Sequence, residues 1–331
     1  MEIRERELWL DSLKGFAIIL VVFGHCIDGV YRMNLFTNYQ SILEISHSVI
    51  YFFHMPLFFA ISGYVFKKCL DSKTNISQYS LNLLVLYFVF ASIQVAIQII
   101  MGKSLNHTYS VNDLLMLPIV TIPPYWYVYV LAIYYIIWHG TEKRIGYKAV
   151  LFLSLLMHTF SILITSNNFE IHRVLYFSCF FIIGYKIDKS AFLEYIIPIS
   201  IIIGIILKLL GRTMLSFPKL SDVLYTSFNM TIVFSIIFSF CFAFKRICLL
   251  NNRFLILCGQ ASLYIYFLHC YLTAGSRIFL SKMKCDNFYI YIVVGTFFGV
   301  AIPLLLYVNR NKCSILKYLF DPIKTLTTRK E

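Results

Sequence analysis

The sequence predicts an all-α, polytopic integral membrane protein: a helical bundle of about ten transmembrane helices with both termini in the cytoplasm. Of the 331 residues, 59% are hydrophobic and only 14% are charged, whereas a soluble domain carries about a quarter charged residues. The mean hydropathy of +0.75 over the chain leaves no room for a separate soluble domain. A span with its loop takes roughly 30 residues, so this length predicts about ten spans.

We expect a single transmembrane domain over residues 1–331. Its spans are expected at roughly 13–33, 48–66, 80–100, 114–138, 147–165, 173–187, 192–210, 223–244, 254–275 and 288–308. Pro118, Pro123 and Pro124 disfavour continuous helix at the start of the fourth span, which predicts a re-entrant or interfacial loop before Trp126. The sixth span is short, as in a tilted or partly buried helix.

The distribution of basic residues predicts the orientation. If residue 1 is inside, the inside segments hold 20 of the 29 Lys and Arg residues, and every inside loop is basic. The net charge of +13 is spread in short groups between apolar stretches, which argues against a nucleic-acid partner. The basic tail after Arg310 is typical of an anchor near anionic membrane lipid; a partner-binding tail is the alternative.

The cysteines and the first apolar segment are interpreted as parts of membrane helices. None of the nine cysteines stands in a C-x-x-C pair and most lie in apolar runs, so we interpret them as small apolar helix residues. We therefore expect neither a disulfide framework nor a metal site. The first apolar run continues as a span, which is atypical of a cleaved signal peptide.

Ionisable residues inside apolar spans are costly, so each one needs a reason. His25 follows Lys14 by eleven residues, which places both on one helix face, roughly 16 Å apart along the axis. Asp11 lies three residues before Lys14, and Asp28 lies one turn beyond His25, where it could orient the imidazole ring. A snorkelling lysine and a packed histidine would give the same pattern.

The second span carries further polar residues. His47 and His54 are seven apart and share a face, and Pro56 favours a kink because it cannot donate to the carbonyl of Phe52. Ser62-Gly63 would allow close helix approach or a backbone contact to a ligand. Each of these features also has a simple packing interpretation.

Other polar elements lie farther along the chain. Trp126 and Tyr127 follow the proline-rich loop, where they indicate either a ligand contact or an interfacial aromatic belt. His269 lies in the apolar run SLYIYFLHCYL, where it is either a functional residue or a histidine packed in the core. With His25 and His54, three spans carry buried histidines, which suits proton transfer near neutral pH. We find no G-x-S-x-G, Walker loop or H-E-x-x-H, so these residues indicate only a membrane enzyme or a transporter.

Five motifs in order resemble the acyltransferase 3 family of integral membrane acyltransferases, best known for bacterial O-acetylation of surface polysaccharides. Lys14 and His25, with ten residues between them, resemble the Arg/Lys-x10-His signature of the first helix. The others are FFHMPLFFAISGY at 52–64, PYWY at 124–127, FFIIGY at 180–185 and SLYIYFLH at 262–269. The resemblance covers nearly the whole chain.

The resemblance implies an O-acyltransferase of the cytoplasmic membrane that uses acetyl-CoA as donor and a glycan or lipid-linked glycan as acceptor, with no metal. It implies His25 as the catalytic residue, acting as a base or as an acyl carrier. Residues expected at the donor entrance are Asp11, Lys14, Lys67 and Lys68; those expected to line the substrate chamber are His54, Ser62, Trp126, Tyr127 and His269.

One stretch departs from the family pattern. The family often opens its third helix with two basic residues followed by Pro-Tyr, and here residues 78–87 read QYSLNLLVLY, with neither arginine and with Leu86 in place of the proline. Arginines there would hold the phosphates of acyl-CoA. Lys67, Lys68 and Lys73 lie nearby on the same side and could substitute as point charges.

Two other classes of function remain open from the sequence. A transporter or flippase for a lipid-linked sugar or small anion also uses buried histidines and kinked helices, and would often show paired interrupted helices in two halves. A glycan polymerase would typically expose a large basic outer loop, whereas the outer loops expected here are short. A purely structural subunit would not need three buried histidines.

Overall fold

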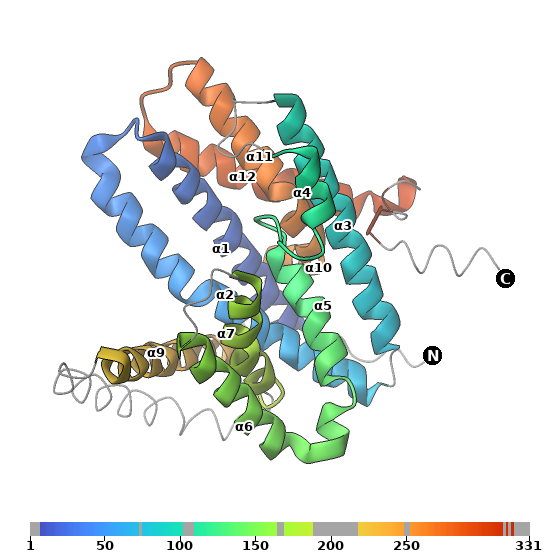
Figure 1. The fold of residues 1–331 in the computed structure, drawn as a ribbon. Helices are drawn as coiled ribbons and strands as arrows, with labels where there is room; N and C mark the ends of the chain where they lie inside the picture. The colour runs from blue at the N-terminus through green and yellow to red at the C-terminus, as the bar shows by residue number, and fades with distance from the viewer. Residues whose placement is uncertain are drawn as a thin grey trace. The chain divides into compact units, whose positions relative to one another are not determined.

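The computed structural model describes residues 7–72, 75–101, 109–163, 169–187, 218–247, 252–313, 316 and 319–320, and over these residues every regular element is helical (Figure 1). The elements are α1 (Leu8–Met33), η1 (Thr37–Tyr39), α2 (Gln40–Asp71), α3 (Ile76–Met101), α4 (Val111–Met116), α5 (Trp126–Trp138), α6 (Thr141–Leu163), α7 (Phe169–Gly184), α9 (Pro218–Arg246), α10 (Arg253–Gln260), α11 (Ser262–Lys282), α12 (Phe288–Val308) and η4 (Arg310–Lys312).

Several of these helices are long and apolar enough to cross a membrane. Five described helices meet this condition, namely α1, α2, α3, α9 and α12, and the bent pair α10–α11 makes a sixth if it counts as one span. The predicted class, an all-α membrane protein, is confirmed. The number of ten spans and the cytoplasmic termini stay predictions, and the span expected at 192–210 lies outside the described residues.

The contacts divide the chain into two compact units, which are described separately below. The first unit comprises Met1–Ile61 and Lys186–Lys312, and the second comprises Ser62–Tyr185 and Cys313–Glu331.

In the first unit, α1 is the central helix. It packs against α9, α10, α11 and α12, and Figure 1 shows it running beside α11 and α12. Its contact with α10 depends on glycines, because a Cβ on Gly15 would collide with the carbonyl oxygen of Leu255 and one on Gly259 with that of Asp11. Small residues permit such close approach of two backbones in membrane helices.

The region of the predicted span 254–275 differs from the expectation of one helix. The structure has two helices there, α10 and α11, with an angle of 83° at the break around Ala261. Helix α10 begins after Asn252, whose side chain accepts a hydrogen bond from the Leu255 amide at 2.8 Å, as an N-cap residue does. Helix α11 then continues to Lys282, beyond the expected end of the span.

In the second unit, α5 packs on α3 and α7, and α7 packs on α6. The Ser80 hydroxyl of α3 donates to the Ala132 carbonyl of α5 at 2.9 Å, and the Tyr134 hydroxyl of α5 donates to the Val174 carbonyl of α7 at 2.7 Å. The expected close approach at Gly63 is confirmed, since a Cβ there would collide with the carbonyl oxygen of Phe181.

The proline-rich region of the predicted span 114–138 is not continuous helix. Helix α4 ends at Met116 and α5 begins only at Trp126, with non-helical backbone between them that contains Pro118, Pro123 and Pro124. The expected interruption before Trp126 is therefore present. Pro56, by contrast, lies inside α2, which runs unbroken from Gln40 to Asp71.

Candidate functional site

Three elements of the first unit bring histidines together. We use the name histidine cluster for His25 on α1, His47 and His54 on α2, and His269 on α11, together with Tyr51 and Cys270. The ring centroids of His25 and His269 lie 5.0 Å apart, although the two residues are far apart in the sequence. His25 is partly exposed, whereas His269 is fully buried.

Helix α11 holds the His269 ring in one orientation. Its Nδ1 lies 2.9 Å from the Ile265 carbonyl oxygen and 2.8 Å from that of Tyr266. A carbonyl accepts only, so Nδ1 carries the proton and donates, which assigns the tautomer from the hydrogen bonds. The Nε2 atom is then the unprotonated nitrogen, and the Sγ of Cys270 lies 3.2 Å from it.

Helix α2 supplies the other side of the histidine cluster. The His47 ring stacks on Tyr51 with centroids 4.0 Å apart, and His54 meets Tyr51 edge-on at 4.7 Å, so the expectation that the two histidines share a face is confirmed. His25 also contacts the Tyr51 ring, at 6.2 Å. The Nδ1 of buried His54 is 2.8 Å from the Ile50 carbonyl, which leaves its Nε2 as the acceptor.

Asp28 has a different partner from the one expected. Its carboxylate accepts hydrogen bonds from Arg32 Nε at 2.9 and 2.8 Å and lies 3.6 Å from His47 Nε2. The i,i+4 ion pair with Arg32 competes with any contact to the His25 ring, one turn back on the same helix. In the structure, the imidazole beside Asp28 is thus that of His47 on α2.

The histidine cluster also contains a possible metal-ligand set. The ligand atoms of His25, His269 and Cys270 all lie within 4.8 Å of one another. Two imidazoles and a thiolate are a donor set that suits Zn²⁺, and a carbonyl bond to the far nitrogen, as at His269, is usual for a ligating histidine. The sequence predicted no metal and treated Cys270 as an apolar helix residue, so this grouping was missed.

Two of the four residues expected at the donor entrance, Asp11 and Lys14, lie on α1 next to its contact with α10. Asp11 is buried, with 5% of its surface exposed, and its carbonyl oxygen faces Gly259. Lys14 is partly exposed. Both are on the N-terminal half of α1, and His25 is on its C-terminal half. Their role at a donor site stays a prediction.

The second unit brings together two of the residues expected in the substrate chamber. The hydroxyls of Ser62 and Tyr127 are hydrogen-bonded at 2.6 Å.

The two lysines expected at the donor entrance, Lys67 and Lys68, already have partners. Lys67 forms an ion pair with Asp71 at 3.0 Å and lies 4.0 Å from Glu142. The Lys68 ammonium lies over the Tyr64 ring, 5.1 Å from its centroid. Carboxylates next to Lys67 would compete with a donor phosphate for its charge.

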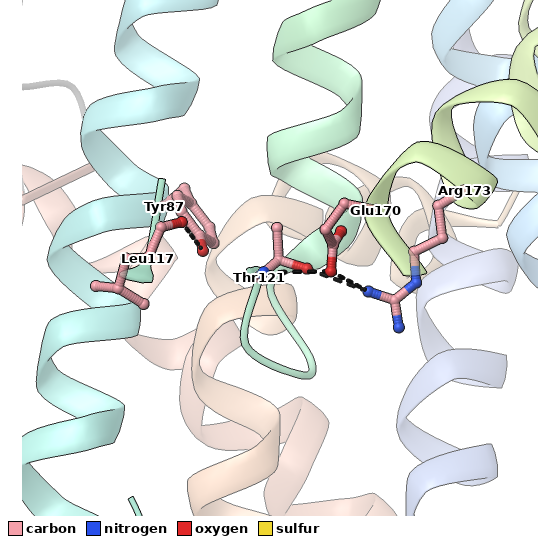
Figure 2. Close-up of polar contacts among 5 residues, drawn as sticks. All are labelled: Tyr87, Leu117, Thr121, Glu170 and Arg173. Carbon is pink, nitrogen blue, oxygen red and sulfur yellow. Dashed lines mark hydrogen bonds and ion pairs between the residues drawn. The ribbon is translucent and has the colours of Figure 1, made fainter. Parts of the chain in front are cut away.

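Trp126 lies beside a polar network that the sequence did not indicate. The Arg173 guanidinium lies over its ring at 4.7 Å, and the Phe177 ring is 5.4 Å away. Figure 2 shows Arg173 and Thr121 both directed at Glu170, whose Oε1 accepts from the Thr121 amide at 3.2 Å and from Arg173 Nη1 at 3.0 Å.

This network fixes the non-helical segment before α5. Arg173 Nη1 also donates to the Thr121 hydroxyl at 3.1 Å, and farther along Figure 2 the Tyr87 hydroxyl of α3 donates to the Leu117 carbonyl at 3.0 Å. The interrupted backbone thus finds hydrogen-bond partners inside the protein, as buried non-helical backbone must. It holds Trp126 in place at the start of α5.

Glu170→Ala is expected to lower the stability of the second unit. The change would leave Arg173 without its carboxylate partner and the Thr121 amide without an acceptor. Removing one partner of a buried ion pair costs about 3–5 kcal/mol, and the cost here is expected at the lower end because the Arg173 side chain remains 19% exposed. Thermal unfolding in detergent measures the effect.

Glu170→Gln and Glu44→Ala are the matched controls for this change. The first keeps an acceptor for Thr121 and should lose less stability, and the second removes an exposed glutamate and should change little. An unchanged melting temperature for Glu170→Ala would mean that the network does not support the segment before Trp126.

Comparison with known proteins gives the family. Residues 7–308 match the family model Acyl_transf_3, described as an acyltransferase domain. The chain therefore belongs to the acyltransferase 3 family. This is the family that the five sequence motifs resemble. The protein is a membrane-embedded member of this class, with a histidine cluster inside its first unit.

Two curated relatives are similar over short regions. The chain is 38% identical over 76 residues to the inner membrane protein YcfT of Escherichia coli (strain K12). The aligned region covers 21% of this chain and 21% of YcfT. The chain is 47% identical over 60 residues to the nodulation protein NolL of Sinorhizobium fredii (strain NBRC 101917 / NGR234), covering 18% of this chain and 16% of NolL. The chain thus matches only 21% of the length of the first relative and 16% of the second. No solved structure matches it.

Proposed function

We propose that this protein is an O-acyltransferase that moves an acetyl group from acetyl-CoA to a sugar hydroxyl of a cell-surface polysaccharide or its lipid-linked precursor. The observation that carries the proposal is the contact of a partly exposed histidine, His25, with the fixed and buried His269. A reachable imidazole can take the proton of a hydroxyl near neutral pH. Membership of the acyltransferase 3 family supports acyl transfer as the reaction.

The proposed chemistry places few demands on the protein. A thioester is already activated, so a base and correct positioning account for much of the rate. His25 removes the proton of the acceptor hydroxyl, and the oxygen attacks the thioester carbonyl as the CoA thiolate leaves. A transient acyl group on the His25 imidazole is the alternative to direct transfer.

The remaining residues are assigned by the same proposal. The donor would be met from the cytoplasm by residues on α1 and at the end of α2, namely Asp11, Lys14, Lys67 and Lys68. Substrate contacts are proposed for His54 and His269 of the first unit, and separately for Ser62, Trp126 and Tyr127 of the second. The name of the inner membrane relative supports a location in the cytoplasmic membrane.

The test is a transfer assay with the purified protein in detergent. Radiolabelled acetyl-CoA is incubated with the protein and a set of glycan and lipid-linked glycan acceptors, and label on each acceptor and free acetate are counted. Label that passes to a glycan supports the proposal. An intact, monodisperse protein that consumes no acetyl-CoA with any acceptor would contradict it.

Lys14→Ala is expected to raise the KM for acetyl-CoA about tenfold or more while the KM for the acceptor stays unchanged. The reason is that a hydrogen bond to a charged group contributes about 1.5–3 kcal/mol, and Lys14 is assigned to the donor phosphates. The control is Lys148→Ala, which removes an exposed lysine of α6. A defect confined to the acceptor KM would show that Lys14 is not at the donor entrance.

A transporter for a lipid-linked sugar or small anion is the second candidate, and one observation favours it. The bent pair α10–α11, with the 83° break, resembles the discontinuous helices that bind substrates in transporters. Among the described residues this is the one bent pair of its kind, whereas transporters often have a matching pair in a second half. Substrate movement into proteoliposomes without any consumption of acetyl-CoA would favour this candidate.

A further inference from the structure

Cys270 lies beside an imidazole of fixed orientation and is itself partly exposed. Its Sγ lies 3.2 Å from His269 Nε2, and the carbonyls of Ile265 and Tyr266 hold the other nitrogen of that ring. His269 is fully buried, whereas Cys270 is partly exposed.

This arrangement is that of an activated nucleophile. A thiol becomes nucleophilic when a neighbouring base accepts its proton, and a third group must orient that base. In such a scheme Cys270 would be the nucleophile and the unprotonated Nε2 of His269 the base, with the carbonyls of Ile265 and Tyr266 as the orienting groups.

His25 adds the group that a second step requires. Its ring lies 5.0 Å from that of His269, and its ligand-type nitrogen lies within 4.8 Å of the Cys270 sulfur. His25 is also partly exposed. An acceptor hydroxyl beside His25 would therefore stand close to whatever Cys270 carries.

We infer that Cys270 is a catalytic nucleophile that accepts the acyl group from the donor and holds it as a thioester before transfer. This inference rests on the proposed function. The sulfur attacks the carbonyl carbon of the acyl-CoA, the carbon–sulfur bond to CoA breaks, and His269 moves the thiol proton to the leaving CoA thiolate. The exchange replaces one thioester by another, so it requires no further energy source.

The second step returns the enzyme to its starting state. His25 removes the proton of the acceptor hydroxyl, whose oxygen attacks the carbonyl carbon of the Cys270 thioester. The carbon–sulfur bond breaks, the ester forms, and the proton taken by His25 passes to the Cys270 sulfur. The two histidines thus act on different steps, His269 in loading and His25 in transfer.

The alternative role of these side chains is to bind a zinc ion, with His25, His269 and Cys270 as its ligands. A metal-bound thiolate cannot carry the acyl group, and a metal-bound His25 cannot take the acceptor proton. The two uses therefore exclude each other, and the experiment includes a measurement of bound metal.

The experiment compares the whole protein with Cys270→Ala, His25→Ala and Cys285→Ala after incubation with radiolabelled acetyl-CoA, with and without acceptor. Cys285 is the matched control because it is another partly exposed cysteine of the first unit. Protein-bound label is tested for release by neutral hydroxylamine, which cleaves thioesters, and is located by peptide mass. Metal content of the purified protein is measured by mass spectrometry.

The expected result is a hydroxylamine-labile acetyl group on Cys270 in the wild type and in Cys285→Ala. It should be absent from Cys270→Ala, with transfer to acceptor at least roughly 100-fold lower. His25→Ala should accumulate the label, because loading continues while transfer stops.

Four results would overturn the inference. Transfer to acceptor with no label on Cys270 in any variant, or undiminished transfer by Cys270→Ala, would refute the relay and leave the proposed function standing. One equivalent of zinc that is lost in Cys270→Ala would assign the cluster to a metal. No consumption of acetyl-CoA by a folded wild-type protein would refute both the relay and the proposed function.

Discussion

His25→Ala is expected to lower acetyl transfer by at least roughly 100-fold, because general acid–base catalysis contributes about 10²- to 10⁴-fold. The side chain is partly exposed, and its ring centroid lies 5.0 Å from that of His269 and 6.2 Å from that of Tyr51. Its removal should therefore cost little packing. The loss of activity should appear in kcat.

The measurement is the radiolabelled transfer assay on protein that elutes as a single species in detergent. His172→Ala is the matched control, since His172 is another partly exposed histidine, on α7, outside the histidine cluster. Wild-type activity in His25→Ala would remove the central residue of the proposed mechanism. A variant that fails to fold would be replaced by His25→Gln, which keeps the size and polarity of the side chain.

Much of the fold follows from local sequence. Apolar stretches bounded by basic loops predict most of the helices: the expected span 288–308 coincides with α12, and 13–33 lies within α1. The interruption before Trp126 also follows from local chemistry, because prolines cannot donate backbone hydrogen bonds. The predicted contact at Gly63 depends on residue size alone, and the structure confirms it.

The break between α10 and α11 could not be predicted in the same way. The residues around Ala261 include no proline, and the apolar run continues on both sides of it. The direction of α10 is set by its contact with α1, where Gly259 meets a residue almost 250 positions earlier in the chain. Hydropathy detects an apolar run but carries no information on such a distant partner.

In the candidate site, too, features that depend on neighbouring residues were predicted, and contacts between distant residues were not. The three buried histidines His25, His54 and His269 were predicted because ionisable groups in apolar spans are conspicuous, and the structure places His25 and His269 in contact. Cys270 was missed because a cysteine in an apolar run resembles packing. The partner of Asp28 was mistaken, although the i,i+4 position of Arg32 is a local signal that competes with His25.

The polar network behind Trp126 was missed for a different reason. Glu170 and Arg173 are three residues apart and could be paired from the sequence, but their link to Thr121 spans about 50 residues. Sequence reasoning explained the prolines before Trp126 as a loop without asking what satisfies its backbone. The answer lies on α7, whose position only the structure gives.

Gly259→Ala is expected to destabilise the first unit strongly, although it adds a single methyl group. The new Cβ would collide with the backbone carbonyl oxygen of Asp11, and the reciprocal contact of Gly15 with Leu255 prevents α1 from sliding aside. Overpacking a close contact costs about 1–3 kcal/mol, and more where backbone rather than a flexible side chain must move. We expect the melting temperature to fall by several degrees and the yield of monodisperse protein to drop.

The matched change is Gly275→Ala on α11, where an added Cβ meets nothing within 4 Å. Both substitutions replace a helical glycine by alanine, which by itself favours the helix by roughly 0.5–1 kcal/mol. The control should therefore melt at the wild-type temperature or slightly above, and the difference between the two variants isolates the collision. Equal melting temperatures would mean that α10 does not rest on α1 through Gly259, and the bend that carries His269 and Cys270 beside His25 would then need another support.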